Sequence, residues 1–323
     1  MKKIGILYGN EKSFPNNYLN KINSIKNKKF QAEFIKVGEI SLDYIVNYDL
    51  IIDRVSNEVP YYRSLLKIAV DSGVNVVNPP NIIDNDDKFY YFVKAKKLGL
   101  NIPNTVILPS KEHPYGTNAE TMQNLIYPLK WEEIFKYIGF PSYIRPNSLN
   151  AVQYDYKVYN EDEFNSMYNL TGSSVMMLQE SIEYENFYKC FVVGNKVRII
   201  NYDPIKPFHL RFSSETNIDT ELKNAIEKDC IKISKEFGLF VNSTEVAIRD
   251  GKHIFVDLIN PVPAVEPNII YEDNFNWFVD SMIELTEELF GKKLLSREIP
   301  KLRTKKSKSK IKKTLKLKEV TTE

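Results

Sequence analysis

The sequence predicts a mixed α/β and α+β protein, in which a small parallel-sheet domain is followed by two α+β lobes. Strand and helix patterns alternate over residues 1–84, which is typical of a parallel sheet with crossover helices. Farther along the chain, strand patterns follow one another through short turns, which favours antiparallel sheets. The chain has 323 residues, of which 43% are hydrophobic and 12% aromatic, so it can form a substantial core in two or three lobes.

Residues 1–84 form the predicted N-terminal α/β domain. Its strands are expected at residues 3–8, 34–37, 48–54 and 74–77. Its helices are expected at residues 16–28 and 61–72, the second of which ends at Gly73. No Gly-x-Gly-x-x-Gly follows the first strand, so a dinucleotide site is unsupported in this domain.

Residues 85–174 form the predicted central lobe. A helix begins after Asp86-Asp87 and runs to Leu98, where Gly99 is typical of a helix end. Further elements are expected as an extended segment at 101–106, a long loop at 111–129, an amphipathic helix at 131–138 and a strand at 142–145.

Residues 175–290 form the predicted C-terminal lobe. Its strands are expected at residues 175–179, 187–193, 196–201, 243–249 and 253–259. Its helices are expected at residues 220–237 and 274–290. Because the strands return through short turns, we expect an antiparallel sheet with helices on one side.

The last segment, residues 291–323, is a basic tail. From Lys301 to Glu323 it carries ten basic and two acidic residues, although the whole chain has a net charge of only +2. Such a run is typical of a solvated, disordered extension. We expect no nucleic-acid partner beyond weak, salt-sensitive contacts through this tail.

Composition excludes several classes of protein. No apolar run approaches the roughly 20 residues needed to span a bilayer, and the chain turns polar at Asn10, too early for a secretory signal. Cys190 and Cys230 lack the spacing of zinc ligands or of a disulfide framework. We therefore expect a cytoplasmic protein without a membrane partner, and the sequence leaves the oligomeric state open.

Three oxygen-bearing side chains of the last predicted hairpin are candidate metal ligands. Glu245 and Asp257 lie on its two strands, and Asn260 follows the second strand. Carboxylate and amide oxygens are the ligands that magnesium takes when it also holds nucleotide phosphates. A two-residue turn would put Glu245 and Asp257 on opposite faces, so we predict a three-residue loop, Asp250-Gly251-Lys252, with a bulge. The chain must also bulge or turn between Asp257 and Asn260. Solvent-facing carboxylates on an ordinary hairpin are the alternative.

Five spaced cations are candidates for contact with phosphate or carboxylate groups: Lys88, Arg145, Lys189, Arg198 and Arg211. A triphosphate requires several fixed positive charges, and strand ends place such charges rigidly. Arg145 ends an apolar strand and precedes Pro146, which favours a functional role. Each of the others, taken alone, also fits a solvated surface charge.

The segment Met176–Ile182 is an apolar strand that ends in polar residues and is followed by Glu183 and Glu185. Adenine requires an apolar slot with backbone hydrogen bonds, and ribose requires an acceptor nearby. Ordinary core packing explains the apolar residues equally well.

In their order along the chain these segments resemble the ATP-grasp superfamily, and within it the ribosomal-protein-glutamate ligases and glutathione-synthetase-like enzymes. The resemblance extends over about residues 85–290. The matching segments are Asp87-Lys88-Phe89 with Gly99–Pro103, Gly139–Pro146, Leu178–Ile182, Phe191–Val197, and Glu245 with Asp257–Pro261. It implies an ATP-grasp fold, in which two α+β lobes clamp ATP, preceded by the small parallel-sheet domain.

The resemblance also implies cofactors and roles for single residues. ATP and Mg²⁺ (or Mn²⁺) would bind, with Lys88 and Arg145 at the phosphates and Lys189 as a further cofactor-binding cation. Gln179, Glu180 and Ile182 would form the adenine hinge, and Glu185 would face the ribose. Glu245, Asp257 and Asn260 would bind the metal.

The implied reaction is ligation of a carboxylate to an amine, or to a thiol, through an acylphosphate. The substrates would be small molecules or peptides. The catalytic candidates Arg211 and Arg198, or else His209, would lie near the acceptor carboxylate, because they follow the predicted hinge strands. The family's glycine-rich loop is replaced by Asn147–Val152, which contains no glycine. A nucleotide-binding pseudoenzyme or regulatory module without turnover is therefore the alternative function.

Overall fold

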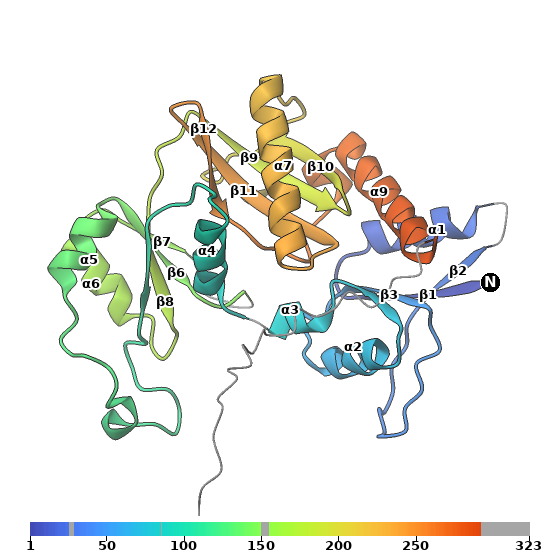
Figure 1. The fold of residues 1–323 in the computed structure, drawn as a ribbon, viewed down its shortest axis with the longest axis horizontal. Helices are drawn as coiled ribbons and strands as arrows, with labels where there is room; N and C mark the ends of the chain where they lie inside the picture. The colour runs from blue at the N-terminus through green and yellow to red at the C-terminus, as the bar shows by residue number, and fades with distance from the viewer. Residues whose placement is uncertain (26–28, 85, 150–154, 292–323) are drawn as a thin grey trace, which may run out of the picture.

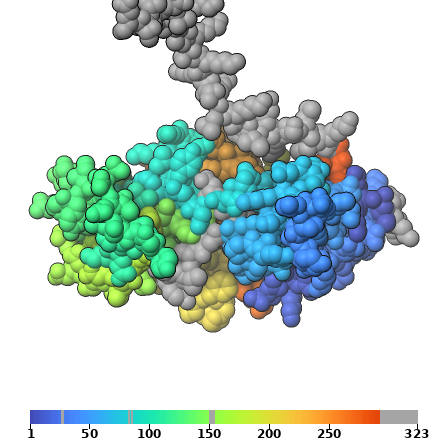
Figure 2. All heavy atoms as spheres, turned by 90° about the horizontal axis from the view of Figure 1, so that it is seen from below, coloured from blue at the N-terminus to red at the C-terminus, as the bar shows by residue number. Residues whose placement is uncertain are grey.

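The computed structural model describes residues 1–25, 29–84, 86–149 and 155–291. They form three four-stranded sheets with helices packed on them (Figure 1). The N-terminal domain and the central lobe lie on opposite flanks of the molecule (Figure 2). The basic tail lies outside the described residues from position 292 onward.

The N-terminal sheet, sheet A, is parallel throughout, as predicted, with strand order β2-β1-β3-β4. Its strands are β1 (Lys2–Tyr8), β2 (Phe30–Phe34), β3 (Leu50–Arg54) and β4 (Asn75–Val77). Its helices are α1 (Ser13–Asn23), α2 (Tyr61–Asp71) and the short α3 (Pro80–Asp84). The second strand was predicted at 34–37 but ends at Phe34, and Ile35 and Val37 instead pack beside α2.

The central sheet, sheet B, is antiparallel with strand order β5-β8-β6-β7. Its strands are β5 (Thr105–Leu108), β6 (Ser142–Pro146), β7 (Tyr156–Val158) and β8 (Met176–Glu180). Helices α5 (Trp131–Ile138) and α6 (Glu161–Asn169) cover one face, and the loop at 111–129 contains a 3-10 turn at Ala119–Met122. The sequence predicts β8 as part of the C-terminal lobe, whereas in the structure it pairs with β5 and β6, so sheet B extends to residue 180.

The C-terminal sheet, sheet C, is antiparallel as predicted, with strand order β10-β9-β11-β12. Its strands are β9 (Asn186–Val193), β10 (Lys196–Asn201), β11 (Val241–Arg249) and β12 (Lys252–Asp257). The associated helices are α4 (Lys88–Lys97), α7 (Thr220–Glu236), the short α8 (Pro267–Ile270), α9 (Glu272–Gly291) and a 3-10 turn at Phe208–Leu210.

Helices cover both faces of sheet C, so the prediction of helices on one side only is wrong. Helices α4 and α7 pack on the face that carries Tyr188 and Cys190, and α9 packs on the face that carries Phe191. Within the described residues, no helix is both long and apolar enough to cross a membrane.

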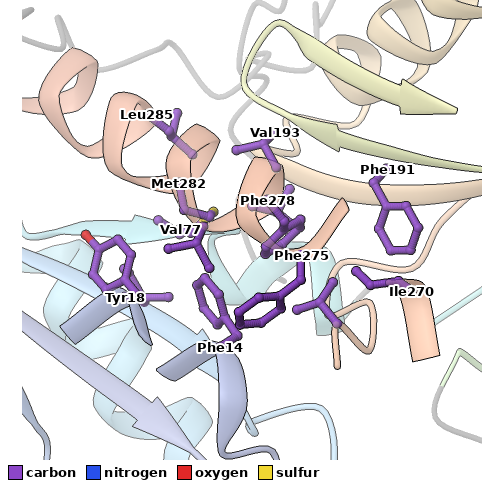
Figure 3. Close-up of a cluster of buried hydrophobic side chains, with 14 of the residues drawn as sticks. Phe14, Tyr18, Val77, Phe191, Val193, Ile270, Phe275, Phe278, Met282 and Leu285 are labelled. Atoms are coloured by element: carbon purple, nitrogen blue, oxygen red, sulfur yellow. The ribbon is translucent and has the colours of Figure 1, made fainter. Parts of the chain in front are cut away.

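One apolar core joins the N-terminal domain to sheet C through α1 and α9 (Figure 3). The ring of Phe278 on α9 lies edge-on to Phe14 of α1, with centroids 5.3 Å apart, and 6.4 Å from Phe191 of β9. The hydroxyl groups of Tyr18 and Thr286 are hydrogen-bonded at 2.7 Å within this core. The parallel sheet is therefore fixed against the C-terminal lobe.

Phe278→Ala should destabilise the protein by about 3–5 kcal/mol, because it leaves a cavity in the core that two parts of the chain share. Urea unfolding followed by circular dichroism measures the loss. Phe208→Ala is the matched control, since Phe208 is 51% exposed, and it should cost less than about 1 kcal/mol. Equal losses for both variants would contradict the shared core.

Candidate active site

The two predicted metal-binding carboxylates lie side by side on adjacent strands. Glu245 of β11 is the register partner of Asp257 of β12, next to a register shift between Glu245 and Val246. The predicted three-residue loop is wrong, because Arg249 pairs with Lys252 and leaves a two-residue turn. Asp250 (φ 53°) and Gly251 (φ 67°) both adopt left-handed conformations, as a tight hairpin turn requires. The bulge therefore lies at the far end of the hairpin from its turn.

Asn260 lies beside β11 because the buried Asn242 holds the chain after β12. The Asn242 Oδ1 accepts a hydrogen bond from Asn260 N, and its Nδ2 donates to Leu258 O, both at 2.9 Å. Asn260 O accepts from Ser243 N at 2.9 Å, which places Asn260 two residues along β11 from Glu245. The sequence did not single out Asn242, although a polar residue inside an apolar strand pattern was a visible sign.

Two cations contact this pair of acids directly. Lys189 of β9 is the register partner of Glu245, and its Nζ lies 2.8 Å from Glu245 Oε1. Arg145 Nη2 lies 4.0 Å from Asp257 Oδ2, and Arg145 Nε lies 2.9 Å from Asp155 Oδ2. Arg145 Nη1 also donates to Val256 O at 3.0 Å. This bond joins sheet B to sheet C.

The charges of the site stabilise one another. Burial raises the pKa of Asp257, but the positive charges of Lys88, Arg145 and Lys189 outweigh burial and hold that pKa below its ordinary value. Burial lowers the pKa of Lys189, and the carboxylates of Glu245 and Asp257 more than restore it. Both shifts favour the charged forms, so Asp257 and Lys189 are charged at neutral pH.

Of the residues predicted to bind adenine and ribose, one contacts Arg145 of the candidate site and the others lie elsewhere. Gln179 is buried beside the acids, where its Oε1 accepts from Arg145 Nη1 at 2.8 Å. Glu180 instead pairs with Arg249 Nη1 at 2.9 Å, and Ile182 is part of the apolar core. Glu185 Oε1 accepts from Asp250 N at 3.2 Å, so Glu185 lies at the hairpin turn and not at the metal-binding end.

The structure separates the two predicted catalytic arginines. Arg211 Nη1 donates to the Tyr202 hydroxyl at 3.1 Å, and Lys189 Nζ lies 5.7 Å from the centroid of the same ring. Arg198 Nε donates to Asn274 Oδ1 of α9 at 2.7 Å. Arg211 is thus connected to the acids through Tyr202 and Lys189, whereas Arg198 ties β10 to α9. His209 lies in the exposed 3-10 turn.

The segment that replaces a glycine-rich loop is attached to the N-terminus of α4. Asp87 caps that helix, and Asn147 Nδ2 donates to Asp87 Oδ1 at 3.1 Å. Asp86 accepts hydrogen bonds from Ser148 Oγ, at 2.5 Å, and from Leu149 N. The predicted loop continues over residues 150–152, which lie outside the described residues. Lys88, the next residue after Asp87, is held close to this attachment because its N donates to Asn147 O at 2.8 Å.

Asn78 joins the N-terminal domain to the strand end that carries Asn260. Its Nδ2 donates to Val241 O and Pro261 O, each at 2.8 Å, and its Oδ1 accepts from Phe240 N and Val241 N. Asn78 is only 3% exposed and has φ 59°, a conformation that Asn tolerates better than most residues. Sequence reasoning missed this contact, since its partners lie far away in the chain.

The donor set fits a magnesium ion that also holds phosphate. Among the described residues, no group of three or more His, Cys, Asp or Glu side chains could enclose a metal. Two adjacent carboxylates suit magnesium, because this ion keeps several waters and substrate oxygens in its shell.

A parallel sheet followed by two antiparallel sheets, with acids and cations where sheet B meets sheet C, is the arrangement expected of an ATP-grasp fold. The comparisons agree with this class. A D-alanine–D-alanine ligase from Bacillus anthracis, crystallised with ATP, superposes with a TM-score of 0.63 at 17% identity, covering 89% of this chain and 97% of that one. A RimK domain ATP-grasp protein from Sphaerobacter thermophilus gives 0.64 at 13% identity, covering 88% and 98%.

A third structure, the ATP-grasp ligase PsnB with minimal precursor, Mg and ADP, gives a TM-score of 0.58 at 12% identity, covering 88% of this chain and 98% of that one. No family model and no curated protein matches the sequence. The chain therefore has the ATP-grasp fold, which confirms the predicted fold class.

Asn78→Ala should lower the free energy of unfolding by about 2–4 kcal/mol, because it leaves buried backbone groups without partners. Asn78→Gly should cost roughly 1 kcal/mol less, since glycine adopts positive φ without strain. Urea titration of both variants measures this order. Asn276→Ala, on the exposed face of α9, is the control and should change stability by less than about 0.5 kcal/mol. Equal stability of Asn78→Ala and wild type would refute the role of this contact.

Proposed function

We propose that the protein is an ATP- and magnesium-dependent ligase that joins a carboxylate to an amine through an acylphosphate. The observation that carries the proposal is the register pairing of Glu245 with Asp257, beside three cations from different parts of the chain. Acids and cations in one place suit a metal-bound triphosphate, because the metal and the lysine or arginine side chains neutralise different oxygens. Two structurally similar proteins, a D-alanine–D-alanine ligase complexed with ATP and the ATP-grasp ligase PsnB complexed with Mg and ADP, support the same reaction class.

In this proposal the cations bind phosphate and the acids bind metal. Lys88, Arg145 and Lys189 would neutralise the phosphates, and Glu245, Asp257 and Asn260 would hold magnesium. When bound, the metal would supply charge neutralisation at the transferring phosphoryl group. With charge neutralised, the remaining task of the protein is to hold the acceptor carboxylate in line with that group.

Arg211 would bind the acceptor carboxylate. Its guanidinium donates a hydrogen bond to the hydroxyl of Tyr202, and Lys189 lies over the ring of the same tyrosine. A carboxylate bound by Arg211 would therefore lie next to the phosphate-binding cations. The Nε of each arginine is engaged, that of Arg211 by Lys206 O and that of Arg198 by Asn274. Arg198 takes no part in this proposal because its contact leads to α9 and not to Lys189. An acylphosphate reacts with amines and with thiols, and the nucleophile would be supplied by the second substrate.

A nucleotide-binding module without turnover is the second candidate. One observation favours it: the Leu149 N–H, at the start of the segment that replaces the glycine-rich loop, already donates to Asp86. A backbone N–H that is engaged in this way does not bind phosphate. Such a protein would gain stability from ATP but release no ADP above background with any acid and amine.

Mg·ATP should stabilise the wild-type protein by about 2.7 kcal/mol at roughly 100 times its dissociation constant. Asp257→Asn removes a charged metal ligand, so it should weaken Mg·ATP binding about tenfold or more. The same variant should bind metal-free ATP as well as wild type or better, because Lys88, Arg145 and Lys189 lose a neutralising carboxylate. Thermal shift with and without magnesium measures both effects.

Asp280→Asn on α9 is the matched control for that experiment. Asp280 is a half-exposed surface residue paired with Lys21, so its loss should leave both nucleotide responses unchanged. A wild-type protein that gains nothing from Mg·ATP, or an Asp257→Asn protein that responds as wild type does, would count against the proposed site.

Arg211→Ala should raise the KM for the acceptor acid at least about tenfold while leaving the KM for ATP unchanged, because it removes a charge-assisted contact to one substrate only. Coupled ADP-release assays over a panel of acids and amines supply both constants. Arg198→Ala is the matched arginine control and should lower stability without changing either KM. Equal kinetic effects of the two variants would refute the assignment to Arg211.

A further inference from the structure

Two clefts adjoin at the start of β5, on the central lobe and outside the site described above. The first has a volume of about 650 Å³ and lies between α4, the segment before β5 and the turn of the β11–β12 hairpin. The second has a volume of about 410 Å³ and lies between β5, α5 and residues 126–130. Tyr137 lines both clefts, while Thr105 lines the first and Val106 the second. Both clefts therefore lie at the beginning of β5, one on each side of Tyr137, and together they are called the groove below.

The outer edge of β5 faces this groove with unpaired backbone groups. Among the described residues β5 pairs with β8 only, so it is an edge strand of sheet B. Glu180 N donates to Asn104 O, and Ser181 N donates to Pro141 O. Along an antiparallel strand, the N–H and C=O groups of successive residues point alternately to one side and the other. Because Asn104 is bonded to β8, Val106 and Leu108 also direct their backbone groups toward β8. The N–H and C=O groups of Thr105 and Ile107 consequently point to the open edge.

This edge lacks the usual protection against strand pairing. Natural edge strands carry charged residues that prevent another chain from pairing with them. Each of the edge strands β2, β7, β10 and β12 has at least one charged side chain, whereas β5 reads Thr-Val-Ile-Leu. The edge strand β4 is also uncharged, but its valines are buried. Ile107, in contrast, is 38% exposed.

Exposed apolar side chains gather around the same edge. Ile126 is 85% exposed and Tyr137 is 46% exposed, and both line the second cleft. Apolar side chains that cluster at a groove mark a binding surface more often than scattered ones do. The loop at 111–129, for which the sequence indicated no purpose, contributes Ile126 to this surface.

The charges of the first cleft favour an acidic occupant. Lys96 and Lys252 line it together with Arg249, and Asp250 is the only acid among its lining residues. The Arg249 charge is already paired with Glu180, so the two lysines remain to bind an acid. The basic C-terminal tail of the protein has the wrong charge for this position, with ten basic and two acidic residues from Lys301 to Glu323.

We propose that the outer edge of β5 binds an extended peptide as an added strand, with an acidic residue at the peptide end that lies beside Lys96 and Lys252. In this mode the backbone of Thr105 and Ile107 supplies hydrogen bonds, and successive peptide side chains enter the faces on either side of the sheet. An apolar side chain occupies the second cleft. This binding does not depend on the proposed ligase reaction.

Fluorescence anisotropy without nucleotide tests the proposal. The probes are fluorescein-labelled octapeptides in which valine alternates with threonine, with glutamates at either end. We expect saturable binding for one of the two glutamate positions. N-methylation of alternate residues removes two backbone hydrogen bonds and should weaken binding about tenfold or more. Absence of binding by every peptide overturns the proposal, and so does equal binding of the N-methylated form.

Variants of the protein test whether the peptide binds at the edge of β5 and beside the two lysines. Ile107→Lys places a charge on the edge and should abolish binding, while Leu170→Lys, at a residue that is 71% exposed and lines neither cleft, should have no effect. Lys96→Glu with Lys252→Glu should reverse the preference from glutamate to lysine peptides. Unfolding temperatures of all variants should match that of wild type. If the double variant Lys96→Glu with Lys252→Glu keeps the preference for glutamate peptides, the proposal of an acidic occupant is overturned.

Two further measurements complete the test: hydrogen exchange at the backbone amides, and analytical sedimentation to detect self-association. Peptide binding should slow hydrogen exchange at the amides of Thr105 and Ile107, and protection confined to other segments overturns strand addition. Acetate or inorganic phosphate that displaces the peptide completely would show that the groove binds a small anion only. Self-association that Ile107→Lys removes would assign the edge to a second copy of this chain instead.

Discussion

The one-residue register shift at the end of the β11–β12 hairpin is the constraint on which the candidate active site depends. Continuous pairing from Arg249 and Lys252 would place Val256 opposite Glu245, with Asp257 on the other face of the sheet. The bulge omits Val256 from the ladder and brings Asp257 to Glu245. The carbonyl group of Val256 then accepts a hydrogen bond from Arg145. A single extra residue therefore supplies both the acid pair and the contact to sheet B.

Sequence patterns predicted the types of residue at the site better than their partners. The strand ends, the acids and Arg145 were visible as polar residues that interrupt or end apolar runs. The position of the bulge was not, because a two-residue turn with a distant bulge and a three-residue loop give the same period-2 pattern near Glu245. Arg198 and Arg211 looked alike in sequence, and only the contacts to Asn274 and Tyr202 distinguish them.

Local sequence patterns also could not predict to which sheet each strand belongs. The strand β8 was recognised, but its partners β5 and β6 are separated from it by at least one helix, so sequence order alone assigned it to the wrong lobe. The same limit applies to α9, whose apolar face was visible while its packing against α1 was not. Long-range pairing and packing determine such assignments, and a single sequence does not display them.

The apolar core that α1 and α9 share restricts how the molecule opens. Sheet A and sheet C are joined by this core and by the four hydrogen bonds of Asn78, so a change in their relative position would break both sets of contacts. Sheet B has a core of its own beneath α5 and α6. A displacement of sheet B relative to sheet C would break the contacts that Arg145 makes with Asp257 and with the carbonyl group of Val256.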